Sequence, residues 1–120
     1  MVSRISLILD DEPAIRTYIG AILERECFQT VEVGTARQGL EILREQGTAI
    51  DLVVSDIHMP EGDGLSFARS AAKLFPGLPI ILVSGYVGGN EVTPFEFVEK
   101  PFSPDALLRA VRKVVAAKAA

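Results

Sequence analysis

The sequence predicts an α/β fold built on a single doubly wound, five-stranded parallel sheet with strand order 2-1-3-4-5. Two observations support this prediction. Short apolar runs alternate along the chain with amphipathic segments of helical spacing, and such alternation is typical of a parallel sheet with helices on both faces. The apolar runs also differ in polarity, which separates central strands from edge strands.

Five segments are predicted to be strands. Three of them are nearly continuous aliphatic runs, as expected of strands buried on both faces, and lie at residues 5–9, 52–55 and 79–83. The other two carry polar positions and fit the edges of the sheet, at residues 29–33 and 95–99. The order 2-1-3-4-5 places the apolar strands in the centre, with right-handed crossovers between them.

Four segments are predicted to be helices. The first, at 13–26, begins with Pro13, which suits a first helical turn. Its apolar residues keep helical spacing at Ile15, Tyr18, Ile19 and Ile22. The last has Ser103 as its predicted N-cap and Pro104 at its first position. The remaining helices are expected at 36–46, 64–75 and 103–118.

The segment between the last two predicted strands is poor in helix formers. Residues 85–94 contain three glycines, Pro94 and the β-branched Val87 and Val92, all of which weaken a helix. We therefore expect a further helix there, the fourth in chain order, to be shortened or irregular. Tyr86 in this segment either shapes access to a site or contacts a partner.

Composition limits the possible functions. The 120 residues fit one domain, 1–120, and the 48% hydrophobic content suits a folded chain. A net charge of −4 argues against nucleic-acid binding, and no apolar run approaches the length of a membrane span. The single cysteine, Cys27, favours a reducing, cytoplasmic setting, and we expect it to be a small buried hydrophobe.

Polar side chains follow the predicted strands at the points where they end. Asp10 and Asp11 follow the first strand, Asp56 the third, Ser84 the fourth and Lys100 the fifth. Ligands of open parallel sheets bind beyond the carboxyl ends of the strands, at the switch point of the strand order. We therefore expect the three aspartates to meet in one crevice flanked by Ser84 and Lys100.

Three carboxylates in one crevice require positive charge, because otherwise their repulsion raises a pKa. Lys100 alone offers too little. Oxygen ligands without clustered histidine or cysteine favour Mg²⁺, with Mn²⁺ as an alternative. A carboxylate beside such a cation and a lysine can attack a phosphoryl group and form an acyl phosphate. Asp56, in the middle of the sheet, is the predicted nucleophile.

These residues resemble the receiver domain of bacterial two-component response regulators and hybrid histidine kinases, a CheY-like module with the flavodoxin-like fold. The resemblance covers essentially the whole chain. It rests on four segments in order: residues 9–13 (LDDEP), 56–60 (DIHMP) with Gly62 and Gly64, 84–85 (SG) and 100–102 (KPF). The Ser-Gly-Tyr run at 84–86 is most similar to receivers of hybrid kinases and to stand-alone receivers.

The resemblance implies roles at the metal and the nucleophile. Asp56 would be the phosphoacceptor and a metal ligand. Asp11 would bind the metal directly, and Asp10 directly or through water. The backbone carbonyl of His58 would be a further ligand, while we expect the His58 side chain to face solvent. Glu12, beside the acidic pair, is expected to serve only as a helix cap.

The resemblance also implies a switch. Ser84 would hydrogen-bond one phosphoryl oxygen, Lys100 would pair with another, and the bond from Lys100 to Pro101 would be cis. Phe97 occupies the aromatic switch position, where it would turn inward as Ser84 moves toward the phosphoryl group. From composition alone, Phe97 is expected to be a core residue first and a switch conditionally.

The leading hypothesis is a phosphotransfer switch rather than a turnover enzyme. Its partners would be a histidine kinase or a histidine phosphotransfer protein, with an output domain either fused or separate. The domain would be a monomer or a weak dimer through the last helix and last strand. The chain is either a whole regulator or a piece of a larger protein.

Two alternatives come from other functional classes. One is a degenerate receiver that only binds partners, which failure to bind Mg²⁺ would favour. The other is an aspartyl-phosphate phosphatase of the haloacid-dehalogenase type. That class needs its nucleophile on the first strand with an acid two residues later, a spacing that Asp10 and Glu12 have.

Overall fold

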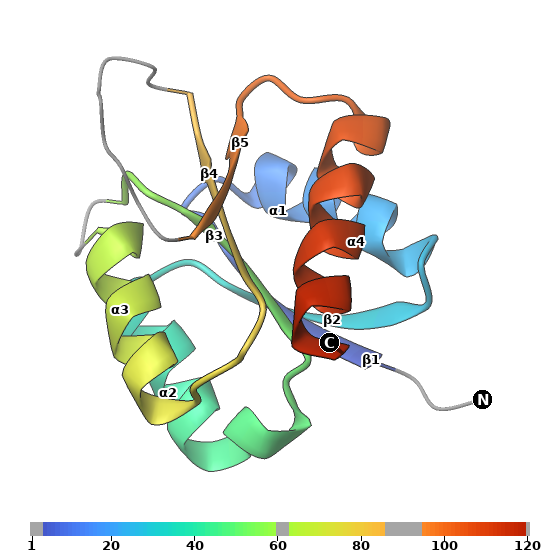
Figure 1. Cartoon of the computed structure of the whole chain (residues 1–120). Coiled ribbons are helices and arrows are strands. Elements are labelled where there is room, and N and C mark those ends of the chain that lie inside the picture. The colour runs from blue at the N-terminus through green and yellow to red at the C-terminus, as the bar shows by residue number, and fades with distance from the viewer. Residues whose placement is uncertain (1–3, 60–62, 86–94, 120) are drawn as a thin grey trace.

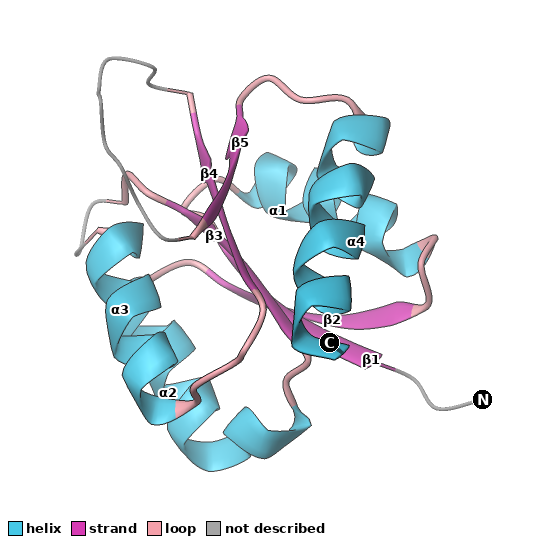
Figure 2. Ribbon diagram, in the orientation of Figure 1, coloured by secondary structure: helices cyan, strands magenta, loops and turns pink. Residues whose placement is uncertain are grey.

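The computed structural model describes residues 4–59, 63–85 and 95–119, and it shows a parallel sheet with helices on both faces (Figures 1 and 2). The sheet has five strands in the order β2-β1-β3-β4-β5, as predicted. Its strands are β1 Arg4–Leu9, β2 Phe28–Val33, β3 Leu52–Asp56, β4 Ile80–Ser84 and β5 Glu96–Glu99. The helices are α1 Pro13–Glu24, α2 Ala36–Gln46, η1 Gly47–Ala49, α3 Gly64–Leu74 and α4 Pro104–Ala119.

The sheet divides the hydrophobic core into two halves. Alternate residues of a strand point to opposite faces, so Ile8 packs with α1 and α4 while Leu7 and Leu9 pack with α2 and α3. Strands β1, β3 and β4 supply side chains to both halves. The three continuous aliphatic runs are therefore the central strands, and the carboxyl ends of β1 and β3 lie side by side.

Side-chain caps set where three of the helices begin. The Oγ1 atom of Thr35 accepts a hydrogen bond from the backbone N of Gln38 at 3.1 Å, and Oδ1 of Asp63 accepts one from Ser66 N at 2.6 Å. The Oγ atom of Ser103, the predicted cap of the last helix, accepts from the backbone N of Ala106 at 3.1 Å. Each bond satisfies an amide that the first helical turn leaves unpaired.

Three expectations about the first helix and the turn after it differ from the structure. The helix ends at Glu24 rather than at residue 26, because the chain turns into the left-handed conformation at Cys27, where φ is 65°. Cys27 is exposed on this turn and is not a buried hydrophobe. Glu12 occupies the N-cap position of α1, but its side chain makes no capping hydrogen bond.

Phe97 also differs from expectation. It lies on edge strand β5 and is 38% exposed, so it is not a core residue. Val98, its neighbour, points to the opposite face and packs into the half of the core that contains α1 and α4. Tyr86 and all of the predicted irregular segment 85–94 except Gly85 lie outside the described residues.

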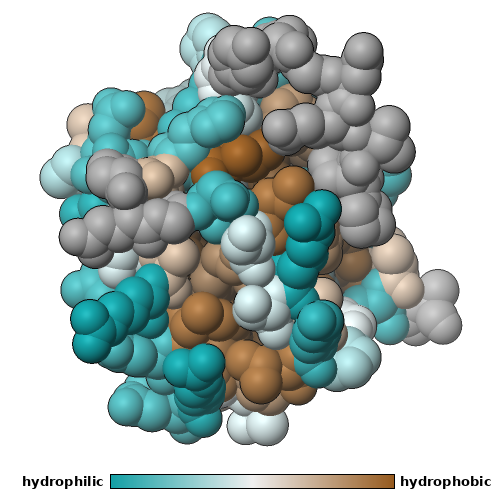
Figure 3. Space-filling model, turned by 90° about the vertical axis from the view of Figure 1, so that its left-hand side faces the viewer, coloured by the Kyte–Doolittle hydropathy of each residue, from teal (hydrophilic) through white to brown (hydrophobic). Residues whose placement is uncertain are grey.

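Large apolar side chains reach the surface of the described chain at three places, Tyr18, Leu74 and Phe97. Figure 3 shows the side of the molecule on which α3 lies, where apolar surface gathers between hydrophilic side chains. Within the described residues, no helix combines the length and the apolar character needed to cross a bilayer.

Candidate functional site

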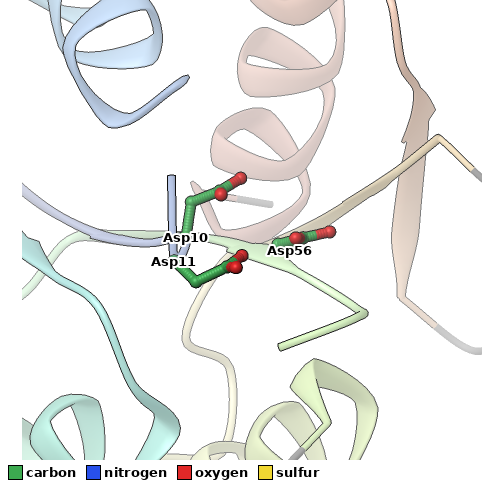
Figure 4. Close-up of side chains that lie close together, drawn as sticks. All are labelled: Asp10, Asp11 and Asp56. Carbon is green, nitrogen blue, oxygen red and sulfur yellow. The ribbon is translucent and has the colours of Figure 1, made fainter. Parts of the chain in front are cut away.

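Three aspartates meet at the carboxyl ends of β1 and β3. Asp10 and Asp11 directly follow β1, and Asp56 is the last residue of β3. One carboxylate oxygen from each residue lies within 4.8 Å of the others. Asp10 is fully buried, Asp56 is 6% exposed, and Asp11 is exposed. Figure 4 shows the three carboxylates directed into a shared space from the two neighbouring strands.

Lys100 supplies the positive charge of this cluster. Its Nζ atom lies 2.8 Å from Oδ2 of Asp10 and 3.5 Å from Oδ2 of Asp56. The backbone N of Lys100 donates to the carbonyl of Ser84 at 2.8 Å, which extends the pairing of β4 with β5 to the edge of the site. The peptide bond from Lys100 to Pro101 is cis, as the resemblance implied.

Burial and charge act on both titratable partners. Burial raises the pKa of Asp56 above its ordinary value of 3.8, Lys100 opposes this rise, and the nearby Asp10 charge adds to it. Burial acts to lower the pKa of Lys100, but the hydrogen bond to Asp10 and the charges of Asp56 and Asp10 outweigh it, so that pKa is raised. When all three aspartates are ionised, the single charge of Lys100 balances only one of them.

The donor set of the cluster fits a hard divalent cation. All three side chains offer carboxylate oxygens, and no histidine or cysteine belongs to this group within the described part of the chain. Hard oxygen donors suit Mg²⁺, which takes one or two carboxylates and completes its shell with water or phosphate oxygens. One ammonium against three carboxylates leaves a negative charge that such a cation would neutralise.

Asp10 is held at every polar atom. Its backbone N donates to the carbonyl of Val33 at 3.3 Å, and its Oδ1 accepts from the backbone N of Glu12 at 2.9 Å. Its Oδ2 faces Lys100, and its backbone carbonyl accepts from Nη1 of Arg16 at 2.6 Å. Arg16 is not among the predicted site residues. The available signal was a cation close to the start of a helix, a position that the helix dipole disfavours.

A glycine lets α3 approach the nucleophile. A Cβ atom on Gly64, the first residue of α3, would lie 1.9 Å from the backbone oxygen of Asp56. The backbone N of Gly64 instead donates to the carbonyl of Ile57 at 2.7 Å. The second glycine of the motif, Gly62, lies outside the described residues. Gly64 thus has a steric reason to stand where it does, and it ties α3 to the end of β3.

The other predicted site residues surround this cluster. Ser84, almost fully buried, ends β4 next to the strand that carries Asp56. His58 is exposed, and its backbone N lies 3.4 Å from Oδ1 of Asp56 as a hydrogen-bond donor. Phe97 lies on β5 opposite Leu82 of β4, with its side chain exposed to solvent.

Comparison with known proteins assigns the family. The family model of the response regulator receiver domain matches residues 6–112. The sensor kinase CckA of Brucella abortus is 33% identical over 115 residues, covering 91% of this chain, and the transcriptional regulatory protein GlrR of Escherichia coli is 31% identical over 111 residues, covering 88%. A response regulator receiver protein from Sinorhizobium medicae has a similar structure, with a TM-score of 0.87, 30% identity and 97% of each chain covered.

This chain belongs to the response regulator receiver domain family. It is a receiver domain of two-component signal transduction. Its five-stranded sheet carries three aspartates at one edge. The chain spans 12% of the length of the CckA relative and 24% of GlrR. Both relatives are therefore much longer proteins that contain a region similar to this chain.

Proposed function

We propose that this receiver domain takes a phosphoryl group onto Asp56 in a Mg²⁺-dependent reaction and that the acyl phosphate changes which surface it offers to partners. The observation that carries the proposal is the convergence of Asp56 with Asp10, Asp11 and Lys100 at one edge of the sheet. A buried carboxylate between two acids and a lysine is placed for chemistry rather than for stability.

The donor would be a phosphohistidine on a histidine kinase or a histidine phosphotransfer protein. A carboxylate oxygen of Asp56 attacks the phosphorus, an oxygen–phosphorus bond forms, and the nitrogen–phosphorus bond to the imidazole breaks. The imidazole leaves with the electron pair of that bond and takes a proton from water. Asp56 must be ionised to attack, so the charge of Lys100 at 3.5 Å favours the reactive form.

A bound Mg²⁺ would neutralise phosphoryl oxygens as charge develops on them. Asp10, Asp11 and Asp56 would hold it, together with the backbone carbonyl of His58 as family resemblance implies. Among the protein groups, Lys100 would orient the acidic cluster and offset part of its negative charge before transfer. Its ammonium would then exchange a carboxylate partner for a phosphoryl oxygen.

The response to phosphorylation would pass through the end of β4 and the middle of β5. Ser84 would donate its hydroxyl to a phosphoryl oxygen, and Phe97, 38% exposed here, would turn into the space that this movement opens. Two packings of one aromatic ring give a two-state element that phosphate contacts can bias. The domain would thus act in the cytoplasm as a switch that catalyses transfer to Asp56 and slow hydrolysis of the acyl phosphate. Its state would control an output domain on the same or another chain.

The phosphatase alternative conflicts with the position of its nucleophile. Asp10 would have to attack the substrate, but it is fully buried and both of its carboxylate oxygens are engaged, by Glu12 N and by Lys100. Asp56 retains the more accessible carboxylate of the two. The geometry therefore favours Asp56 as the acceptor.

Intact-protein mass spectrometry tests the proposal. The chain is incubated with MgCl₂ and either acetyl phosphate or a phosphohistidine-containing phosphotransfer protein, and we expect one added phosphoryl group. Asp56→Ala and an EDTA control should both remove the adduct, whereas Asp105→Asn, at an exposed acid on α4, should keep it. An adduct that persists in Asp56→Ala would refute the assignment. No adduct from either donor, together with no Mg²⁺ binding, would leave the partner-binding alternative.

A further inference from the structure

Arg16 reaches from α1 back to the acidic turn. Its Nη1 donates to the backbone carbonyl of Asp10 at 2.6 Å, and its Nε lies 3.4 Å from Oε1 of Glu32 on β2. The side chain is 20% exposed, and the buried Nε makes no hydrogen bond within the described part of the chain, so the contact with Glu32 is an ion pair only. A cation close to a helix N-terminus does not stabilise that helix. The stability of α1 therefore does not explain an arginine at position 16, and its contacts outside this helix do.

The contact with Asp10 controls more than Asp10 itself. The carbonyl of Asp10 and the amide of Asp11 belong to one planar peptide group. A donor that fixes this carbonyl therefore fixes the orientation of the whole peptide plane, including the backbone N of Asp11. Asp10 is already held at its backbone N and at both carboxylate oxygens. Asp11 is exposed, so its direction depends on this peptide plane more than on packing.

We propose that Arg16 is a positioning residue for the divalent cation site: it fixes the peptide group that joins Asp10 to Asp11 and thereby sets the direction in which the Asp11 carboxylate enters the cluster. Glu32 holds the guanidinium and offsets part of its charge. A planar guanidinium presents its donors in a rigid fork that suits two fixed partners, whereas an ammonium is a compact charge on a flexible stem. The inference rests on the cation site of the proposed function and adds a residue outside the acidic cluster to it.

The sign of one measurement separates positioning from simple charge. Arg16 is a cation near a site for a cation, so by Coulomb repulsion alone its removal would strengthen Mg²⁺ binding. A positioning role predicts the opposite, because loss of an outer contact that orients a ligand weakens metal affinity, typically by about tenfold or more. The two explanations cannot both account for one result.

The test is a titration with MgCl₂ alone, measured by isothermal calorimetry at fixed ionic strength and without a phosphoryl donor. Arg16→Met should bind Mg²⁺ about tenfold more weakly than the unsubstituted chain. Arg16→Lys keeps the charge and should fall between the two. The matched control is Arg112→Met, because Arg112 donates to Oε1 of Glu26 at 2.8 Å in another arginine–glutamate pair, near the opposite end of α1. We expect its affinity to stay within about twofold.

Each outcome decides something. Unchanged or tighter binding in Arg16→Met would overturn the inference, as would an equal loss in Arg112→Met. Circular dichroism shows whether Arg16→Met is folded. If it is not, Arg16→Lys decides, since weaker binding with the charge retained supports positioning and unchanged binding overturns it. No Mg²⁺ binding by the unsubstituted chain would refute the proposed function together with this inference, whereas normal binding with unaffected variants would overturn the inference alone.

Discussion

The replacement Gly64→Ala should harm both the stability and the chemistry of this domain. The added Cβ would lie 1.9 Å from the backbone oxygen of Asp56 and 2.8 Å from its carbonyl carbon, whereas ordinary contacts begin at 3.4 Å. The start of α3 and the end of β3 would have to separate by 1.5 Å (3.4 − 1.9). Both partners are backbone, so no side-chain rotation relieves the contact.

The cost of such overpacking is on the order of 3 kcal/mol. An unfolding entropy of about 2.1 cal/mol/K per residue means that a domain of 120 residues loses about 4 °C of Tm per kcal/mol. We therefore expect Gly64→Ala to lower Tm by about 12 °C. Because the shift falls on the backbone of Asp56, phosphoryl uptake from acetyl phosphate should fall as well.

The matched control is Gly20→Ala within α1. The atom nearest to a Cβ at Gly20 is 3.7 Å away, an ordinary contact. Alanine is the better helix former by about 1 kcal/mol, so this variant should melt about 4 °C higher with unchanged phosphoryl uptake. The steric reasoning would be refuted if Gly64→Ala melted within about 2 °C of the unsubstituted chain and still accepted the phosphoryl group.

Three further predictions concern the charge cluster and a helix cap. Burial, and then the nearby Asp10 charge, raise the pKa of Asp56 above 3.8. The protonated Asp56 side chain therefore stabilises the fold below that pH, and this stabilisation is lost as the pH rises through the raised pKa. Asp56→Asn should increase the free energy of unfolding in EDTA at neutral pH and flatten the dependence of that free energy on acidic pH, measured by urea unfolding. Lys100→Met removes the cation 2.8 Å from the buried Asp10 and should cost about 2 kcal/mol in EDTA, more than Lys113→Met, which breaks the pair with Glu96 in which the lysine is 72% exposed; equal losses would contradict this. Thr35→Ala removes the cap of α2 and should cost about 1 kcal/mol without changing Mg²⁺ affinity.

Polarity was enough to separate the central strands from the edge strands, and the flavodoxin-like order 2-1-3-4-5 satisfies that division. Strands buried on both faces have no polar side, so continuous aliphatic runs such as residues 52–55 identify the centre of the sheet. The strand order then predicts that Asp10, Asp11 and Asp56 meet, because parallel strands end at one edge. Strand order alone would favour Asp56 as the partner of Lys100, because β3 lies closer to β5 than β1 does. The structure assigns the shorter contact to Asp10.

The missed features depend on local geometry that spacing does not encode. The left-handed turn at Cys27 ended α1 early, and cysteine gives no signal for that conformation. Phe97 is a large apolar residue of the kind usually found in a core. Its strand lies at the edge of the sheet, however, so its side chain reaches solvent. The cation near a helix start hints at Arg16, but its partner is a backbone carbonyl, which the side-chain pattern does not identify.

The exposed thiol of Cys27 makes this domain ready for spectroscopy without mutation. It is the only cysteine of the chain, so a maleimide spin label attaches at one defined place. Helix α1 starts beside the acidic cluster and ends just before this turn, and its 12 residues span about 18 Å. A Mn²⁺ ion bound at the cluster would broaden the spectrum of a nitroxide at Cys27 by dipolar coupling along α1. This broadening would report occupancy of the cation site without any phosphoryl transfer.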